Sequence, residues 1–146
     1  LEEHNKHLQE KFKTMTQAEV RTETTNMKDS LIAVVAYGSV ARIAKLAVAK
    51  ARSRGIRAGL IRPIALWPFP DKAIQDACFS AKRFLTVEMN AGQMVEDVRL
   101  SVPDRLPVHF YGRQGGVTPT PQEVLEKVLQ LPEVSARNLC SVETRS

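Results

Sequence analysis

The sequence predicts an α/β domain, a three-layer αβα sandwich with a mainly parallel sheet. Short apolar segments rich in β-branched residues alternate with longer segments whose apolar residues recur at helical spacing. The connections between them are short, as expected for parallel strands joined by right-handed crossovers. With 146 residues, 43% of them hydrophobic, the chain is long enough for one domain with its own core.

The first thirty residues differ from the rest. Leu1, Leu8, Phe12 and Met15 form one apolar stripe on a predicted helix that is otherwise charged, and the polar residues 22–26 are predicted to be an exposed connection. Two interpretations stay open: a surface helix followed by a loop, or a linker from an upstream domain. Because the chain starts at Leu1, with no initiator Met and no charged-then-apolar leader, we expect a fragment of a longer protein without a signal peptide.

The first predicted strand is Leu31–Tyr37, a continuous apolar run typical of a strand covered on both faces. Gly38 and Ser39 then turn the chain into a helix predicted over Val40–Arg54. Gly55 is placed to end that helix.

The second predicted strand is Ala58–Ile61, ended by Arg62 and the proline after it. The following segment, Pro63–Pro70, contains three prolines and is predicted to be a stiff loop. Its aromatic residues, Trp67 and Phe69, are interpreted as an interface or a lid to the core rather than a stacking platform.

A short helix is predicted over Asp71–Ala77, and a buried strand over Arg83–Met89. The next helix is predicted from Met94 to about Ser101, because Glu96 and Asp97 favour a helix N-terminal turn.

A fourth strand is predicted over Pro107–Tyr111. Thr120 is expected to cap the last helix, with Pro121 at its first position and Glu123 completing a capping box. The predicted organisation is a linker helix and loop, one α/β domain and a loosely held tail, at residues 1–30, 31–131 and 132–146.

Unusual residues follow each predicted strand at what should be one edge of the sheet, where parallel α/β domains meet ligands and partners. We therefore expect substrate, anion or interface contacts there, although no residue is predicted to be catalytic. The candidates are Gly38, Ser39, Arg62, Glu88, Asn90, Gly92, Gln93, Gly112, Arg113, Gly115 and Gly116.

Each polar candidate has two interpretations. Gly38 and Ser39 precede a helix and could bind an anion, but a tight turn with a Ser cap is favoured because the glycines of a dinucleotide or phosphate loop are missing. Arg62 and Arg113 could clamp a carboxylate or phosphate; pairing with Glu88 is favoured. Glu88 could be a general acid or base, or could accept hydrogen bonds from the backbone or an arginine.

Composition excludes several classes of function. The net charge is +5, but the basic residues are scattered and aromatics make up only 5%, so we expect no nucleic-acid partner. No apolar run is long enough for a membrane span. Cys78 and Cys140 lie in no CxxC motif, which predicts no zinc or iron–sulfur site and fits free thiols in a reducing cytoplasm. His4 and His7 lack a third ligand, so no metal site is expected.

Four runs are distinctive in their order and spacing: VVAYGSVAR, GLIRPIALWPFP, FLTVEMNAGQMVEDVRL and FYGRQGG. From Leu31 to about Leu131 the chain resembles the C-terminal domain of the alpha subunit of 2-oxoacid:ferredoxin oxidoreductases, above all the 2-oxoglutarate and ketoisovalerate types. The resemblance implies a transketolase C-terminal-like fold. It also implies an enzyme that uses thiamine diphosphate to decarboxylate a 2-oxoacid oxidatively, reduces ferredoxin through iron–sulfur clusters and releases an acyl-CoA.

The resemblance further implies that the reaction needs parts outside this chain. They are an upstream pyrimidine-binding domain, a beta subunit that binds thiamine diphosphate and Mg, and an iron–sulfur subunit. The chain is then expected to bind no cofactor alone and to be inactive alone, contributing assembly and the edge of the active site; Arg62 or Arg113 could contact an anionic substrate or CoA. The alternatives are the equivalent domain of a transketolase or a 2-oxoacid dehydrogenase beta subunit, and a non-catalytic dimerisation or anion-binding module.

Overall fold

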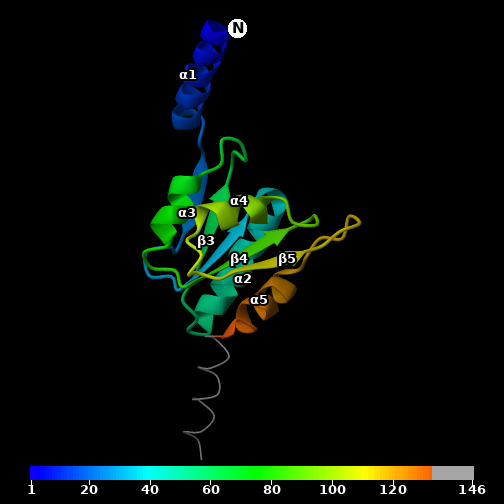
Figure 1. Ribbon diagram of the computed structural model, residues 1–146. Helices are drawn as coiled ribbons and strands as arrows, with labels where there is room; N and C mark the ends of the chain where they lie inside the picture. The colour runs from blue at the N-terminus through cyan, green and yellow to red at the C-terminus, as the bar shows by residue number, and fades with distance from the viewer. Residues whose placement is uncertain (133–146) are drawn as a thin grey trace, which may run out of the picture.

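The structure, a computed structural model, describes residues 1–132 (Figure 1). Its five-stranded sheet has the order β1-β3-β2-β4-β5. The strands are β1 (Thr22–Thr25), β2 (Ile32–Ala36), β3 (Ala58–Pro63), β4 (Arg83–Glu88) and β5 (Val108–Gly112). The helices are α1 (Glu2–Ala18), α2 (Gly38–Ser53), α3 (Asp71–Ala77), α4 (Met94–Ser101) and α5 (Pro121–Leu129).

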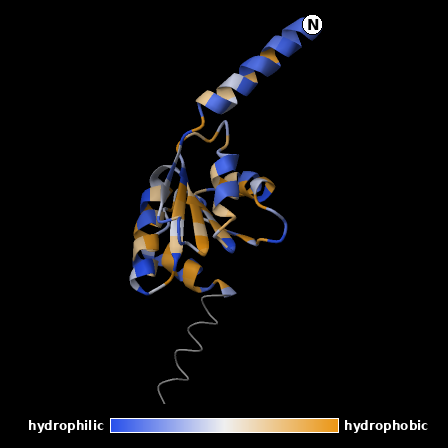
Figure 2. Cartoon of the chain, turned by 90° about the vertical axis from the view of Figure 1, so that its left-hand side faces the viewer, coloured by the Kyte–Doolittle hydropathy of each residue, from blue (hydrophilic) through white to orange (hydrophobic). Residues whose placement is uncertain are grey.

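The sheet lies between two helical layers, which confirms the predicted sandwich. Strands β2, β3, β4 and β5 run parallel, and β1 pairs antiparallel with the outer edge of β3. Helices α2 and α5 pack on one face with the first core cluster, while α3 and α4 pack on the other with the second (Figure 1). The apolar strands lie between the helices, and the outward faces of these helices are polar (Figure 2).

The central strand β2 shows why the sequence folds this way. All five of its residues are buried, and they alternate between the two core clusters: Ile32, Val34 and Ala36 face α2 and α5, whereas Ala33 and Val35 face α3 and α4. A strand covered on both faces needs a continuous apolar run, and the sequence supplies it.

Strand β1 corrects the prediction of an exposed connection over residues 22–26. Thr22–Thr25 forms an edge strand in which Thr22 lies opposite Pro63 and Thr25 opposite Leu60. Its four residues are half-buried or exposed, so this strand can form without the apolar residues that mark a buried strand in the sequence. Threonine favours extended backbone, and the pairing covers the edge of β3.

The helix ends partly agree with the predictions. Gly55, with φ +78°, follows the end of α2 as expected, and Thr120 and Glu123 form the predicted capping box of α5. The predicted Ser39 cap is wrong: α2 begins earlier, at Gly38, and its N-cap residue is Tyr37, which makes no side-chain capping bond.

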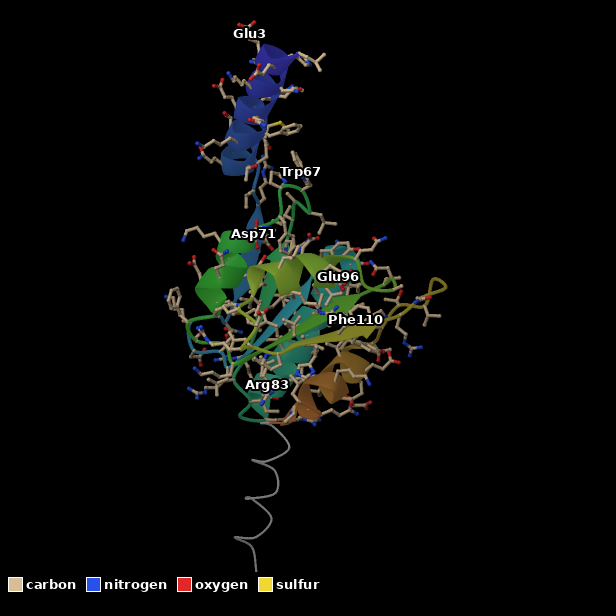
Figure 3. The ribbon with its side chains drawn as sticks, viewed as in Figure 1. Glu3, Trp67, Asp71, Arg83, Glu96 and Phe110 are labelled. Atoms are coloured by element: carbon tan, nitrogen blue, oxygen red, sulfur yellow. The ribbon has the colours of Figure 1, made fainter. Side chains whose placement is uncertain are left out.

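Helix α1 stands away from the sandwich and buries none of its residues (Figure 1). It meets the β3–α3 loop where Phe12 lies edge-on to Trp67, with ring centroids 5.9 Å apart (Figure 3). Trp67 remains 60% exposed, whereas Phe69 packs on the second core cluster. Both interpretations of the linker helix remain predictions.

The predicted tail, 132–146, lies outside the described residues apart from Pro132. Within residues 1–132, no helix combines the length and the apolar character that crossing a membrane requires.

Candidate functional site at the carboxyl edge of the sheet

The strand order reverses between β2 and β4. From β2 the chain crosses to β3 on one side, then returns over β2 to β4 on the other side. The connections that leave β2 and β4 consequently lead to α2 and α4 on opposite faces of the sheet. In open parallel sheets such a switch point opens a crevice at the carboxyl edge, where ligands bind.

Glu88, the last residue of β4, is fully buried at this edge. Its Oε2 accepts hydrogen bonds from the backbone N–H groups of Met94 (2.9 Å) and Gln93 (3.3 Å), and its Oε1 accepts one from Val95 N–H at 2.9 Å. These amides lie at the N-terminus of α4. The first N–H groups of a helix have no partner within the helix, and negative charge is favoured there. Glu88 thus accepts backbone hydrogen bonds at the start of a helix, as one of its two interpretations predicts.

Asn90 holds the loop between Glu88 and α4 in shape. Its Oδ1 accepts from Gly92 N–H at 2.7 Å and from Gln93 N–H at 3.2 Å. Its Nδ2 donates to the Tyr37 hydroxyl at 3.2 Å. Because Tyr37 follows β2, this bond joins the two strand ends on either side of the switch point.

Gly92 and Gly112 allow the β4–α4 loop to pack against β5. A Cβ on Gly112 would come within 2.4 Å of the Phe110 ring and 2.5 Å of the Asn90 carbonyl oxygen. Gly92 has φ +103°, in the region that favours glycine, and its Cβ position lies 3.4 Å from the same ring. Phe110, labelled in Figure 3, therefore lies over both glycines.

Arg113 continues this packing from the end of β5. Its backbone N–H donates to the Glu88 carbonyl oxygen at 3.0 Å. Its guanidinium donates to the Tyr111 hydroxyl at 3.2 Å and forms an ion pair with Glu123 of α5. The expected pairing of the Arg113 side chain with Glu88 is wrong, because the Glu88 carboxylate is already occupied by α4.

Arg62 lies elsewhere along the edge, at the end of β3. One terminal nitrogen donates to Glu23 of β1 at 3.1 Å, so this arginine does not pair with Glu88 either. Strands β3 and β5 are separated by β2 and β4, and at about 4.8 Å per strand the two arginines lie roughly 14 Å apart across the sheet. Each of the two arginines is paired with a different carboxylate, Arg62 with Glu23 and Arg113 with Glu123.

The remaining candidates are open to solvent. Gly38 and Ser39 are exposed at the start of α2, and Gln93 is exposed beside them at the start of α4. Gly115 and Gly116 are exposed on the β5–α5 loop, which projects from the sheet edge in Figure 1. The structure therefore places Gly38, Ser39, Asn90 and Gln93 just after the ends of the neighbouring strands β2 and β4, whereas Arg62 lies near the end of β3.

Titratable groups add little chemistry at this edge. Burial, followed by the charge of Arg83, lowers the pKa of His109, whose Nε2 is buried without a hydrogen-bond partner. Burial raises the pKa of the Cys78 thiol on the α3 side of the domain. Among residues 1–132, no group of three or more His, Cys, Asp or Glu side chains is placed to hold a metal ion. Cys140 lies outside the described residues.

Sequence reasoning missed three contributors to the site. Tyr37 and Phe110 are predicted only as strand residues, and no local signal in the sequence indicates their contacts with Asn90 and Gly112. Glu123 was recognised only as a capping residue; it caps α5 and also pairs with Arg113.

Comparison with known proteins identifies the domain. Residues 31–124 match the family described as pyruvate:ferredoxin oxidoreductase core domain II. Over 131 residues the chain is 43% identical to the ketoisovalerate oxidoreductase subunit VorB of Methanothermobacter thermautotrophicus, covering 90% of this chain and 37% of that protein. It is 39% identical over 101 residues to the 2-oxoglutarate synthase subunit KorA of Methanothermobacter marburgensis, covering 69% of this chain and 27% of that protein.

Two solved structures share the fold. A 2-oxoglutarate:ferredoxin oxidoreductase from Magnetococcus marinus matches with a TM-score of 0.66 at 20% identity, over 74% of this chain and 19% of that one. A split gene transketolase matches with a TM-score of 0.65 at 16% identity, over 78% of this chain and 42% of that one. Both agree with the predicted transketolase C-terminal-like fold.

The chain spans only part of the length of the curated relatives, 37% of the ketoisovalerate subunit and 27% of the 2-oxoglutarate synthase subunit. These relatives are oxidoreductase subunits, as the sequence resemblance implied. In this chain, strand β2, the switch point and the β4–α4 loop all lie within residues 31–124, which match the family. On this match the chain belongs to the pyruvate:ferredoxin oxidoreductase core domain II family.

Proposed function

We propose that this chain is the C-terminal domain of the alpha subunit of a 2-oxoacid:ferredoxin oxidoreductase. The observation that carries the proposal is the 43% identity to a ketoisovalerate oxidoreductase subunit over 90% of this chain. In the proposed reaction a 2-oxoacid and coenzyme A yield an acyl-CoA and CO2, and the two electrons released reduce ferredoxin.

The contribution of this chain is to assemble and shape the edge of the active site. The polar groups of Glu88, Asn90 and Arg113 are engaged within the domain, which supports a positioning role and no direct part in the chemistry. Two loops of the same edge, whose residues are half-buried or exposed, form contact segments for neighbouring domains and subunits: Asn90–Gln93 and Gly112–Gly116.

We propose that thiamine diphosphate, Mg and the iron–sulfur cluster are bound by other parts of the complex. Within residues 1–132 no group of three or more His, Cys, Asp or Glu side chains is placed to hold a metal ion, and Cys78 is the one cysteine there, whereas a cluster needs about four thiolates. The proposed partners are the upstream pyrimidine-binding domain, the thiamine-diphosphate-binding beta subunit, the iron–sulfur subunit and coenzyme A. The free thiol supports placing this complex in the reducing cytoplasm.

The test is reconstitution of the complete complex from the full-length alpha subunit and its companions. Coenzyme-A-dependent reduction of ferredoxin is followed with a panel of 2-oxoacids. We expect turnover by the complete complex, and none by this chain alone or by a complex whose alpha subunit lacks the domain. A cofactor-loaded complex that turns over no 2-oxoacid would contradict the proposal and leave only the fold.

A loop variant separates an active-site edge from a purely structural dimerisation module. Replacing the exposed Gln93 by alanine should lower kcat/KM about tenfold without dissociating the complex, because it changes only a contact segment. The matched control is Lys50→Ala on the exposed far end of α2. Equal activity of both variants would favour the structural module.

Ferredoxin reduction also separates this proposal from a transketolase or a 2-oxoacid dehydrogenase beta subunit. Those enzymes share the fold and use no ferredoxin. A complex that decarboxylates a 2-oxoacid without reducing ferredoxin would therefore favour these alternatives.

For the arginines, the test is the Michaelis constants of the complete complex. We expect Arg113→Gln to leave them unchanged, because Arg113 is engaged by Tyr111 and Glu123.

A further inference from the structure

A small polar hollow lies between α2 and the edge strand β1, and residues of β3 also line it. Its volume is about 110 Å³. Two buried apolar residues, Ala41 and Leu60, form its floor. Four charged side chains surround it: Glu23, Arg42, Lys45 and Arg62.

The fold explains why three cations gather there. Arg42 and Lys45 are three residues apart on α2 and therefore lie on one side of the helix. Arg62 follows Leu60 by two positions on β3, so it points to the same face of the sheet, the face that α2 covers. Strand β1 extends the sheet beyond α2, which leaves the hollow open at its side.

The positive charge of the hollow is only partly neutralised. Glu23 engages one terminal nitrogen of Arg62 at 3.1 Å, while the Nε of Arg62 is buried without a hydrogen-bond partner. Arg42 and Lys45 are exposed and form no ion pair with any residue from 1 to 132. Three cations and one carboxylate leave a formal charge of +2 around the hollow.

We propose that this hollow binds a phosphate group. A phosphate monoester carries about −1.5 to −2 charge at neutral pH, which matches the uncompensated +2. Arginine is suited to such oxygens because its planar guanidinium donates two parallel hydrogen bonds. Glu23 competes with the phosphate for Arg62, so it sets an upper limit on the affinity. The inference does not depend on the proposed function of the domain.

The test is a titration of the ¹⁵N-labelled 146-residue chain with inorganic phosphate, AMP and adenosine, followed by NMR. We expect phosphate and AMP to shift the amide signals of Ala41, Arg42, Lys45 and Arg62, and adenosine to shift none of them. If AMP binds at least as tightly as inorganic phosphate, the natural ligand is a phosphorylated metabolite. If inorganic phosphate binds and AMP does not, the natural ligand is the free phosphate ion.

Charge variants sharpen the test. The double variant Arg42→Gln/Lys45→Gln should weaken phosphate binding about tenfold. The control Lys50→Gln/Arg54→Gln removes the same charge from the last turn and the C-cap of α2 and should change the binding less than twofold. Glu23→Gln should tighten binding about threefold, because it frees Arg62.

Two outcomes would overturn the proposal. One is equal weakening by both double variants, which would reduce the effect to net charge. The other is weaker or unchanged binding in Glu23→Gln, which would remove the competition that the geometry requires.

Discussion

Helices α2 and α4 begin side by side at the switch point, yet their first turns are built differently. The amides at the start of α4 donate hydrogen bonds to Glu88, the last residue of β4, and to Asn90 of the loop that follows it. The start of α2 has no side-chain cap, and Gly38 and Ser39 are exposed. In the β4–α4 junction, which we call the closed junction, the helix amides are thus bonded within the domain. In the β2–α2 junction, which we call the open junction, the start of the helix is available to a partner or ligand.

The length of each connection explains the difference. Between β4 and α4 lie five residues, Met89–Gln93, enough for the chain to fold back until the amides of α4 reach the Glu88 carboxylate. Between β2 and α2 lies Tyr37 alone, and its hydroxyl is turned to Asn90 instead. A one-residue connection leaves no side chain in position to cap the helix.

The largest expected effect comes from breaking the closed junction with Glu88→Gln. The amide side chain keeps one acceptor but turns an NH2 group toward a backbone N–H in a fully buried place. We expect the free energy of unfolding to fall by about 3–4 kcal/mol, since a buried donor left unpaired costs about 1–3 kcal/mol and bonds to charged groups about 1.5–3 kcal/mol. Urea unfolding monitored by circular dichroism measures it.

The matched control is Glu96→Gln, in the first turn of the same helix but exposed and paired only with Arg99. A surface pair of this kind contributes at most about 1 kcal/mol. Equal losses from the two variants would show that Glu88 acts only as a charge near the helix and not as a buried cap.

The glycines of the two junctions give the next largest contrast. Gly112→Ala places a Cβ 2.5 Å from the Asn90 carbonyl oxygen, backbone that cannot move aside, so we expect a loss of about 2–3 kcal/mol. Gly38→Ala meets nothing within 4 Å and suffers only from its φ of +58°, which costs about 1 kcal/mol. Thermal unfolding of the two variants ranks them; the reverse order would contradict the packing of the β4–α4 loop on β5.

The bond between the junctions should contribute less. Tyr37→Phe removes the hydroxyl that accepts from Asn90 and should cost about 1 kcal/mol. A double-mutant cycle with Asn90→Ala isolates the contact, with an expected coupling of about 0.5–1 kcal/mol from urea unfolding. Additive losses would mean that the two junctions are independent.

The smallest effect concerns pH and His109, on the strand that supports the closed junction. Its pKa is lower in the folded protein than the 6.5 of a free histidine, so between these values the unfolded chain binds more protons. Stability should therefore fall as the pH drops from about 7.5 to 5.5. His109→Gln should reduce that pH dependence, as measured by urea unfolding at both pH values. An unchanged slope would assign the acid sensitivity to other groups.

Much of the fold follows from local patterns in the sequence. Continuous apolar runs specified the buried strands, and Thr120, Pro121 and Glu123 specified the start of α5, because these signals act within a few residues. Strand β1 was missed because its stability comes from pairing with β3, about forty residues away, and four polar residues give no period to detect.

The candidate site was harder to predict. The sequence located the carboxyl edge, since every parallel strand ends in glycine or polar residues. It could not assign partners: Arg62, Arg113 and Glu88 were all expected to pair together, whereas the fold provides Glu23, Glu123 and the α4 amides instead. Such choices depend on three-dimensional distances that one sequence does not contain.

Amide hydrogen exchange, measured by mass spectrometry, tests the central contrast between the closed and the open junction most directly. It is followed in this chain alone and again in the complete complex with its upstream domain and companion subunits. We predict slow exchange at Met94 and Val95 in both states, and exchange at Gly38 and Ser39 that is fast in the chain and slow in the complex. Unchanged fast exchange at Gly38 and Ser39 on assembly would contradict the expected substrate, anion or interface contact at the start of α2.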